Sequence, residues 1–158
     1  MAKRYNLKVV FDPGAHNLVK SDFQLFKRLL DVCDVFCPNL EEAKAITRTN
    51  QLETAIERLQ KKERLTAIKC GEDGCILINE KQIVKVPGFK AKCVDSTGAG
   101  DSFAAALIFG LAKKFSLKNV GQLANWFASQ VTTQIGARNF PSKTEIRIFL
   151  KELRTAEK

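Results

Sequence analysis

With 158 residues, of which 45% are hydrophobic and 27% charged, the sequence predicts a single globular domain with one substantial core. No apolar run reaches the roughly 20 residues needed to cross a bilayer, and residues 1–6 lack the apolar core of a signal peptide, so we expect a cytoplasmic protein. The formal net charge is +9, but basic side chains are interleaved with acidic ones and no aromatic platform accompanies them. This pattern favours a solvated surface over a nucleic-acid or membrane interface.

The first half of the sequence alternates short apolar runs with helical patterns. The apolar runs end at turn residues and predict five strands, at 7–11, 32–37, 65–69, 75–79 and 82–86. Apolar residues spaced three and four positions apart predict helices at 23–30, 41–46 and 51–62, the first of them capped by Ser21 or Asp22. The last two strands follow a turn between Gly71 and Gly74, and we expect them to pair as a hairpin.

The second half is predicted to be mainly helical, with helices at 100–115, 119–135 and 143–153. The first of these carries no charged residue from Phe103 to Ala112, so we expect it to be buried. Strands that alternate with helices indicate an α/β fold in which a parallel sheet is flanked by helices. We expect this fold to occupy residues 1–158 as one domain.

The five cysteines do not show the spacing of a metal or redox site. Cys33 and Cys37 are separated by three residues and Cys70 and Cys75 by four, whereas zinc and redox sites use C-x-x-C. Most of the five cysteines, of which Cys93 is the fifth, sit in apolar segments such as Val35-Phe36-Cys37. We therefore expect reduced and mostly buried thiols.

Several common catalytic motifs are missing from the sequence. It contains no G-x-x-x-x-G-K-[ST] segment, and Phe103 stands where a dinucleotide-binding fingerprint has its third glycine. The single histidine, His16, follows a turn and is expected to be a polar loop residue, because no G-x-S-x-G segment accompanies it. Trp126 lies on a predicted helix and is interpreted as a packing residue.

The most informative segment is Asp95-Ser96-Thr97-Gly98-Ala99-Gly100-Asp101, directly before the uncharged helix. Its glycines allow backbone N–H groups to turn inward at a helix N-terminus and form an anion cradle. A carboxylate beside such a cradle suits a hydroxyl that attacks a phosphoryl group, since the amides hold the developing charge while the carboxylate takes the proton. Taken alone, the segment also fits an ordinary turn, with Thr97 or Ser96 as N-cap and Asp101 stabilised by the helix dipole.

This segment closely resembles the Asp-Thr-x-Gly-Ala-Gly-Asp signature of the ribokinase or PfkB-type family of carbohydrate and nucleoside kinases. Other segments resemble the family in the same order along the chain: Phe-Asp-Pro at 11–13, Pro-Asn-Leu-Glu-Glu-Ala at 38–43, Gly-Glu-Asp-Gly at 71–74 and the helix from 124 to Gly-Ala at 136–137. The resemblance implies a ribokinase-like α/β fold. It also implies ATP-dependent phosphotransfer, with Mg²⁺, to a hydroxyl of a sugar or nucleoside.

The resemblance assigns catalytic roles to the glycine-rich segment. Asp101 corresponds to the catalytic base, and the backbone amides of Gly98, Ala99 and Gly100 correspond to the anion hole. Asp95 and the carbonyl of Thr97 match part of a monovalent-cation site, for an ion such as K⁺, that several members have. The remaining positions of that cation site cannot all be matched in this sequence.

Further residues correspond to the nucleotide side of the family's site. Asn39 and Glu42 match a pair that organises Mg²⁺ and its waters, and they equally suit an Asn cap with a first-turn Glu. Three residues, Lys69, Gly71 and Gly74, match a loop that approaches phosphate or ribose, although Glu-Asp-Gly also forms an ordinary turn. Asn125 matches a residue beside the adenine.

Family members also carry an N-terminal half with sugar-binding strands and a lid, which has no counterpart here. The first predicted strand would then lie at an unprotected sheet edge. We expect either self-association through the edge near residues 9–11 or a complementary N-terminal chain. The sequence leaves the acceptor undetermined, and it leaves open a catalytically silent nucleotide-binding or assembly module. Polyanion binding through the net charge is a third, weaker alternative.

Overall fold

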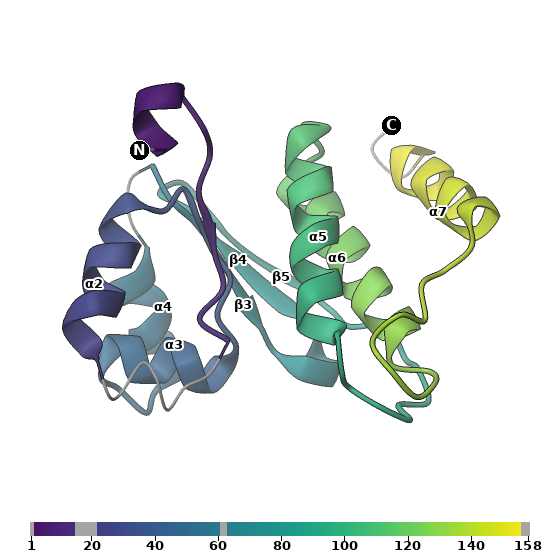
Figure 1. The fold of residues 1–158 in the computed structure, drawn as a ribbon, viewed down its shortest axis with the longest axis horizontal. Coiled ribbons are helices and arrows are strands. Elements are labelled where there is room, and N and C mark those ends of the chain that lie inside the picture. The colour runs from purple at the N-terminus through teal and green to yellow at the C-terminus, as the bar shows by residue number, and fades with distance from the viewer. Residues whose placement is uncertain (1, 15–21, 61–62, 156–158) are drawn as a thin grey trace. The chain divides into compact units, whose positions relative to one another are not determined.

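The computed structural model describes residues 2–14, 22–60 and 63–155, which form two compact units (Figure 1). The N-terminal unit comprises residues 1–71 and 75–85, and the C-terminal unit comprises residues 72–74 and 86–158. That residues 1–158 form one domain stays a prediction. The expectations for His16 and Ser21 concern residues outside the described ranges.

A five-stranded sheet has the order β1-β2-β3-β4-β5. Its strands are β1 Val10–Phe11, β2 Val35–Phe36, β3 Leu65–Lys69, β4 Cys75–Ile78 and β5 Ile83–Val86. Strands β1 and β2 are shorter than the segments predicted at 7–11 and 32–37. Strands β1, β2 and β3 run parallel, whereas β4 is antiparallel to β3. The predicted parallel arrangement therefore holds for three strands. Only the 3-10 turn η2 (Gly71–Asp73) joins β3 to β4, and so short a connection reverses the chain, because a parallel crossover needs a dozen or more residues.

Three helices lie together on one side of the sheet in the N-terminal unit: α2 Phe23–Val32, α3 Leu40–Thr47 and α4 Leu52–Leu59 (Figure 1). The Asp22 side chain caps α2 by accepting a 3.0 Å hydrogen bond from the Leu25 amide. A short 3-10 helix, η1 (Ala2–Tyr5), precedes β1. Apolar side chains from the helices and the sheet form one core, which includes Phe26, Phe36, Ile46, Ile56, Ile68 and Ile78.

The C-terminal unit contains α5 Ala99–Ala112, α6 Leu117–Val131 and α7 Lys143–Thr155. Helices α5 and α6 pack along each other. Trp126 of α6 stacks on Phe149 of α7 with ring centroids 4.3 Å apart, which confirms its interpretation as a packing residue. The buried Asn119 side chain adds a second tie between these helices by donating to the Leu153 carbonyl at 3.0 Å.

Helix α5 is buried on one face only, so the expectation of a fully buried helix was wrong. Phe103 and Leu107 are among its buried residues, but Ile108 and Phe109 remain 44% and 42% exposed. The absence of charge from Phe103 to Ala112 predicts apolar surroundings, yet Phe109 borders an apolar pocket that also involves Phe127. Within the described chain, the outward face of α5 is therefore uncovered.

The cysteines agree with the expectation of reduced and mostly buried thiols. All five thiols are free; Cys33, Cys37 and Cys75 are buried, Cys70 is half-buried and Cys93 is exposed. Among the described residues, no group of three or more metal-ligating side chains is found. No helix in the described ranges is both long enough and apolar enough to span a membrane.

Candidate active site

The start of α5 requires a glycine. Gly98 is the N-cap residue and has a φ of +82°, a left-handed conformation that favours glycine. A Cβ atom added to Gly98 would lie 2.7 Å from the Ala137 Cβ and 2.9 Å from its Cα. No side chain caps the helix, so the ordinary turn capped by Thr97 or Ser96 is not the one that forms. The α5 N-terminus is therefore built without a side-chain oxygen over its amides.

The amides of this turn are only partly used. The Ala99 amide donates to the Ser96 carbonyl at 3.2 Å, and the Ser102 amide donates to the Gly98 carbonyl at 2.9 Å. Within the described part of the chain, the Gly98 and Gly100 amides have no acceptor, as is usual for the first turn of a helix. Two of the three predicted anion-hole amides are thus available to a ligand.

The predicted base, Asp101, lies in the first turn of α5 with an exposed side chain. Among the described residues, no hydrogen bond or ion pair engages its carboxylate. The first turn of a helix favours a negative charge. Asp101 therefore presents an accessible carboxyl group beside two free amides.

Asp95 fastens the loop that precedes this turn. Its Oδ1 accepts hydrogen bonds from the Thr97 amide at 2.9 Å and the Thr97 hydroxyl at 2.6 Å, and its Oδ2 accepts one from the Gly136 amide at 2.8 Å. These bonds, led by that of the Thr97 hydroxyl, lower the pKa of Asp95 to about 2. Because a carboxyl with a lowered pKa stabilises the fold above its unfolded-state pKa, this contribution is lost only as the pH falls toward 2. Asp95 therefore holds the loop in place throughout the neutral range.

Two chain segments, 72–74 and 86–88, approach each other closely at the turn that follows β3. Gly74 is buried and has a φ of +97°, and a Cβ there would lie 2.2 Å from the Val86 carbonyl oxygen. A Cβ on Gly88 would lie 2.1 Å from the Glu72 carbonyl oxygen. The buried Asn125 side chain donates to the carbonyls of Val86 at 3.1 Å and of Pro87 at 3.0 Å. Gly74 and Asn125 therefore have a structural role at this turn: Gly74 permits the close approach of the two segments, and Asn125 binds the carbonyls of one of them.

Asn39 and Glu42 form a capping box at the start of α3. The Glu42 amide donates to Asn39 Oδ1 at 2.9 Å, and the Asn39 amide donates to Glu42 Oε2 at 2.8 Å. Asn39 is exposed, whereas Glu42 is only 1% exposed. The structural alternative of an Asn cap with a first-turn Glu is therefore present, and each side chain already uses one oxygen in it.

Lys69 forms an ion pair that the sequence did not predict. It is the last residue of β3, and its ammonium binds the carboxylate of Asp12, which directly follows β1. The backbones of Lys69 and Asn39 form an isolated parallel β-bridge. The sequence offered one signal for this ion pair: both residues follow or end a predicted strand, and the carboxyl ends of parallel strands share one edge of a sheet. The pKa of the Cys37 thiol is raised to about 12, mainly by burial and next by the negative charge of Asp12.

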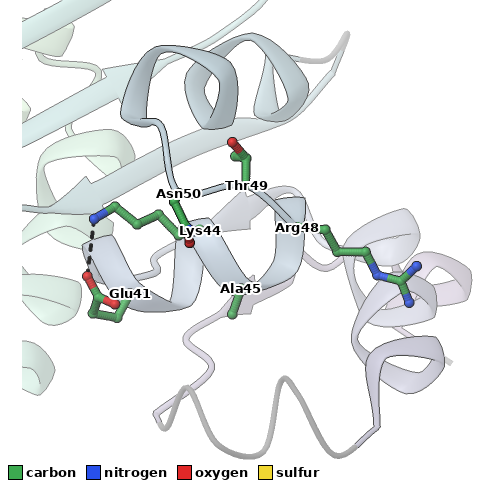
Figure 2. A pocket seen from close by; sticks show the side chains of 6 residues that line it. All are labelled: Glu41, Lys44, Ala45, Arg48, Thr49 and Asn50. Atoms are coloured by element: carbon green, nitrogen blue, oxygen red, sulfur yellow. Dashed lines mark hydrogen bonds and ion pairs between the residues drawn. The ribbon is translucent and has the colours of Figure 1, made fainter.

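The predicted residues divide between the two units. Asn39, Glu42 and Lys69 gather in the N-terminal unit, joined there by Asp12. The loop from Asp95 to Asp101 lies in the C-terminal unit, as do Gly74 and Asn125. A polar pocket elsewhere on α3 is lined by none of the predicted site residues; Figure 2 shows its lining, in which Lys44 pairs with Glu41 at 3.3 Å.

Comparison with known proteins identifies the family. The model of the pfkB family of carbohydrate kinases matches residues 2–145. The chain belongs to this family. A ribokinase from Lactococcus lactis is 32% identical over 152 residues, which cover 96% of this chain and 48% of that protein. This pfkB-family chain thus spans about half the length of the curated relatives that it matches.

Solved structures of kinases share the fold. Adenosine kinase from Sinorhizobium meliloti superimposes with a TM-score of 0.85 at 27% identity, covering 98% of this chain and 46% of that one. Fructokinase from Vibrio cholerae, solved with fructose, ADP and a calcium ion, gives a TM-score of 0.77 at 27% identity, covering 94% and 52%. These matches confirm the ribokinase-like α/β fold.

Proposed function

We propose that this chain binds ATP and supplies the catalytic base for phosphoryl transfer to a hydroxyl of a sugar or nucleoside. The observation that carries the proposal is the start of α5, where an exposed carboxylate, Asp101, shares an uncapped helix turn with the free amides of Gly98 and Gly100. The acceptor oxygen attacks the γ-phosphorus as the bond from that phosphorus to the ADP oxygen breaks. The hydroxyl proton passes to Asp101, and the amides stabilise negative charge on the transferred group.

Asn39 and Glu42 would help to hold Mg²⁺ through its waters. They offer the oxygen ligands that Mg²⁺ prefers, and Mg²⁺ commonly keeps several waters and uses few protein ligands beside the phosphates. Asn39 Oδ1 and Glu42 Oε2 both accept backbone hydrogen bonds in the capping box, so their contact with the ion would be indirect, through its waters. The ion would neutralise charge on the phosphates. A monovalent ion such as K⁺ at Asp95 and Thr97 is a weaker proposal, because both Asp95 oxygens already accept hydrogen bonds.

The nucleotide side of the proposal rests on Lys69, Gly71, Gly74 and Asn125. The backbone is open to a ligand at Gly71, where φ is +62° and no atom lies within 4 Å of the place that a Cβ would occupy. A related fructokinase was solved with ADP, which supports a nucleotide as ligand. The acceptor class follows only from the family, whose members here include sugar and nucleoside kinases.

A second candidate is a catalytically silent nucleotide-binding or assembly module. The observation that favours it is that none of the residues assigned to the site binds the acceptor, in a chain that spans 48% of a related ribokinase. A chain without acceptor-binding residues would retain the nucleotide side and not turn over alone. Both candidates share nucleotide binding, and only the first includes transfer.

Addition of ATP with Mg²⁺ is expected to raise the melting temperature in a saturable manner. A ligand that binds only the folded state at about 100 times its Kd stabilises that state by about 2.7 kcal/mol, which a thermal-shift titration resolves easily. Adenosine, which lacks the phosphates, serves as the control and should stabilise less. No stabilisation at millimolar ATP would remove the nucleotide assignment for this chain.

We also propose a protein partner at the β1 edge, either a complementary N-terminal chain or a second copy. Strand β1 is at the end of the strand order, and the Val9 and Phe11 carbonyls accept hydrogen bonds from β2-side amides. The backbone of Val10 therefore faces the open edge. Unpaired edges of this kind favour association with another strand.

Light scattering at micromolar concentration is expected to show self-association of the isolated chain. Val10→Lys should reduce it, because a charged side chain on an edge strand disfavours further pairing. Ile83→Lys makes the same change on β5, at the opposite end of the strand order, and should leave this association intact. A monomeric chain with a cooperative melt would contradict the self-association.

A further inference from the structure

An ion pair links the ends of two strands that are not neighbours. Asp12 follows β1 and Lys69 ends β3, with β2 between them, so the pair joins residues 57 positions apart across one strand. The side chains are 28% and 17% exposed, respectively. An ammonium that is partly withdrawn from water needs a compensating partner. Asp12 supplies that partner.

The position of the pair distinguishes it from the other ion pairs of the N-terminal unit. Lys8 and Asp34 form an ion pair at 2.9 Å, but they lie just before β1 and β2. The Lys8 side chain is 80% exposed. Asp12 and Lys69 lie at the carboxyl ends of the parallel strands. Ligands in open α/β sheets bind outside that edge.

Lys69 retains binding capacity in this arrangement. An ammonium has several N–H donors, and the described contacts commit it to the Asp12 carboxylate alone. Asn39, the residue that bridges Lys69, begins α3 at the same edge. An ammonium held at this edge by the Asp12 carboxylate is suited to bind phosphate oxygens, which it attracts as a point charge.

We propose that Asp12 is a positioning residue, which holds the Lys69 ammonium at the carboxyl edge of the sheet for the polyphosphate of a nucleotide. This inference rests on the proposed function, since it takes the nucleotide as ligand. It adds a residue outside the set predicted for the site and names the part of the ligand that Lys69 binds. The terminal phosphates of ATP and ADP bind Lys69, whereas AMP does not reach it.

Removing the Asp12 charge changes nucleotide affinity in opposite directions for the two roles that Asp12 could have. If Asp12 acts only as a nearby negative charge, its neutralisation strengthens the binding of an anionic nucleotide. If Asp12 positions Lys69, the same change weakens that binding, because the ammonium loses its fixed place. The sign of the change in affinity therefore separates the two roles.

Calorimetric titration of the whole chain with Mg²⁺ and ATP, ADP or AMP tests the proposal. Asp12→Asn and Lys69→Met are each expected to weaken ATP binding about tenfold and to leave AMP binding nearly unchanged. The double variant should be no weaker than Lys69→Met, because the two residues act as one unit. Lys8→Met, which breaks the pair at the other end of the strands, should leave ATP affinity unchanged.

A second variant protects the test against loss of the fold. Asp12→Glu keeps the charge but displaces the carboxylate, and it is expected to weaken ATP binding, whereas a purely electrostatic role requires no change. Thermal melts identify variants that remain folded. ATP affinity that is unchanged or increased in folded Asp12→Asn and Asp12→Glu would overturn the positioning role alone. Failure of the unsubstituted chain to bind ATP would instead remove the proposed function and this role with it.

Discussion

Asp101→Asn is expected to lower kcat of the phosphotransfer reaction by about 10²–10⁴-fold, the usual contribution of a general base. The amide is similar in size to the carboxylate but cannot accept the hydroxyl proton. Nucleotide affinity should remain nearly unchanged, because the base acts on the acceptor in the transition state, whereas ground-state binding depends on other groups. Steady-state kinetics, with the complementary chain present where turnover requires it, measure kcat, and calorimetry measures the affinity.

Glu152→Gln provides a matched control for Asp101→Asn. It removes one exposed carboxylate from α7 in the same unit and leaves the start of α5 unaltered. We expect kcat to be unaffected. If Asp101→Asn retained most of the turnover, Asp101 would be a helix-dipole residue and not the base.

Gly74→Ala is expected to destabilise the fold by about 2–5 kcal/mol, through both backbone strain and overpacking. The new Cβ would lie 2.2 Å from the Val86 carbonyl oxygen and 2.4 Å from the Gly88 nitrogen. These are backbone atoms, which cannot rotate away as the end of a flexible side chain does. Urea denaturation of the variant and the unsubstituted chain measures the difference.

Gly71→Ala separates the two causes. Gly71 also has a positive φ, +62°, but no atom lies within 4 Å of its Cβ position. Alanine there introduces backbone strain alone, which costs about 1–2 kcal/mol. Equal losses for the two variants would show that the contact between the 72–74 and 86–88 segments contributes nothing.

Local features of the structure could be read from the sequence. The Asn39 and Glu42 spacing suits a capping box, and the box forms, because its bonds connect residues three apart. The glycine-rich segment predicts a helix start, and α5 begins at Ala99, one residue before the predicted Gly100. The strand predicted at 32–37 was shorter in the structure, since Val32 still belongs to α2. Helix and strand ends are set by competing neighbours and are harder to locate.

The features that only the tertiary structure decided join residues far apart in the chain. Asp12 meets Lys69 because three parallel strands place their carboxyl ends at one edge, and no local pattern encodes that pairing. Gly98 approaches Ala137, and Asn125 reaches the Val86 carbonyl, for the same kind of reason. A sequence determines hydrogen bonds and periodicity over a few residues directly. Contacts across tens of residues depend on how whole elements pack, which is a property of the assembled fold.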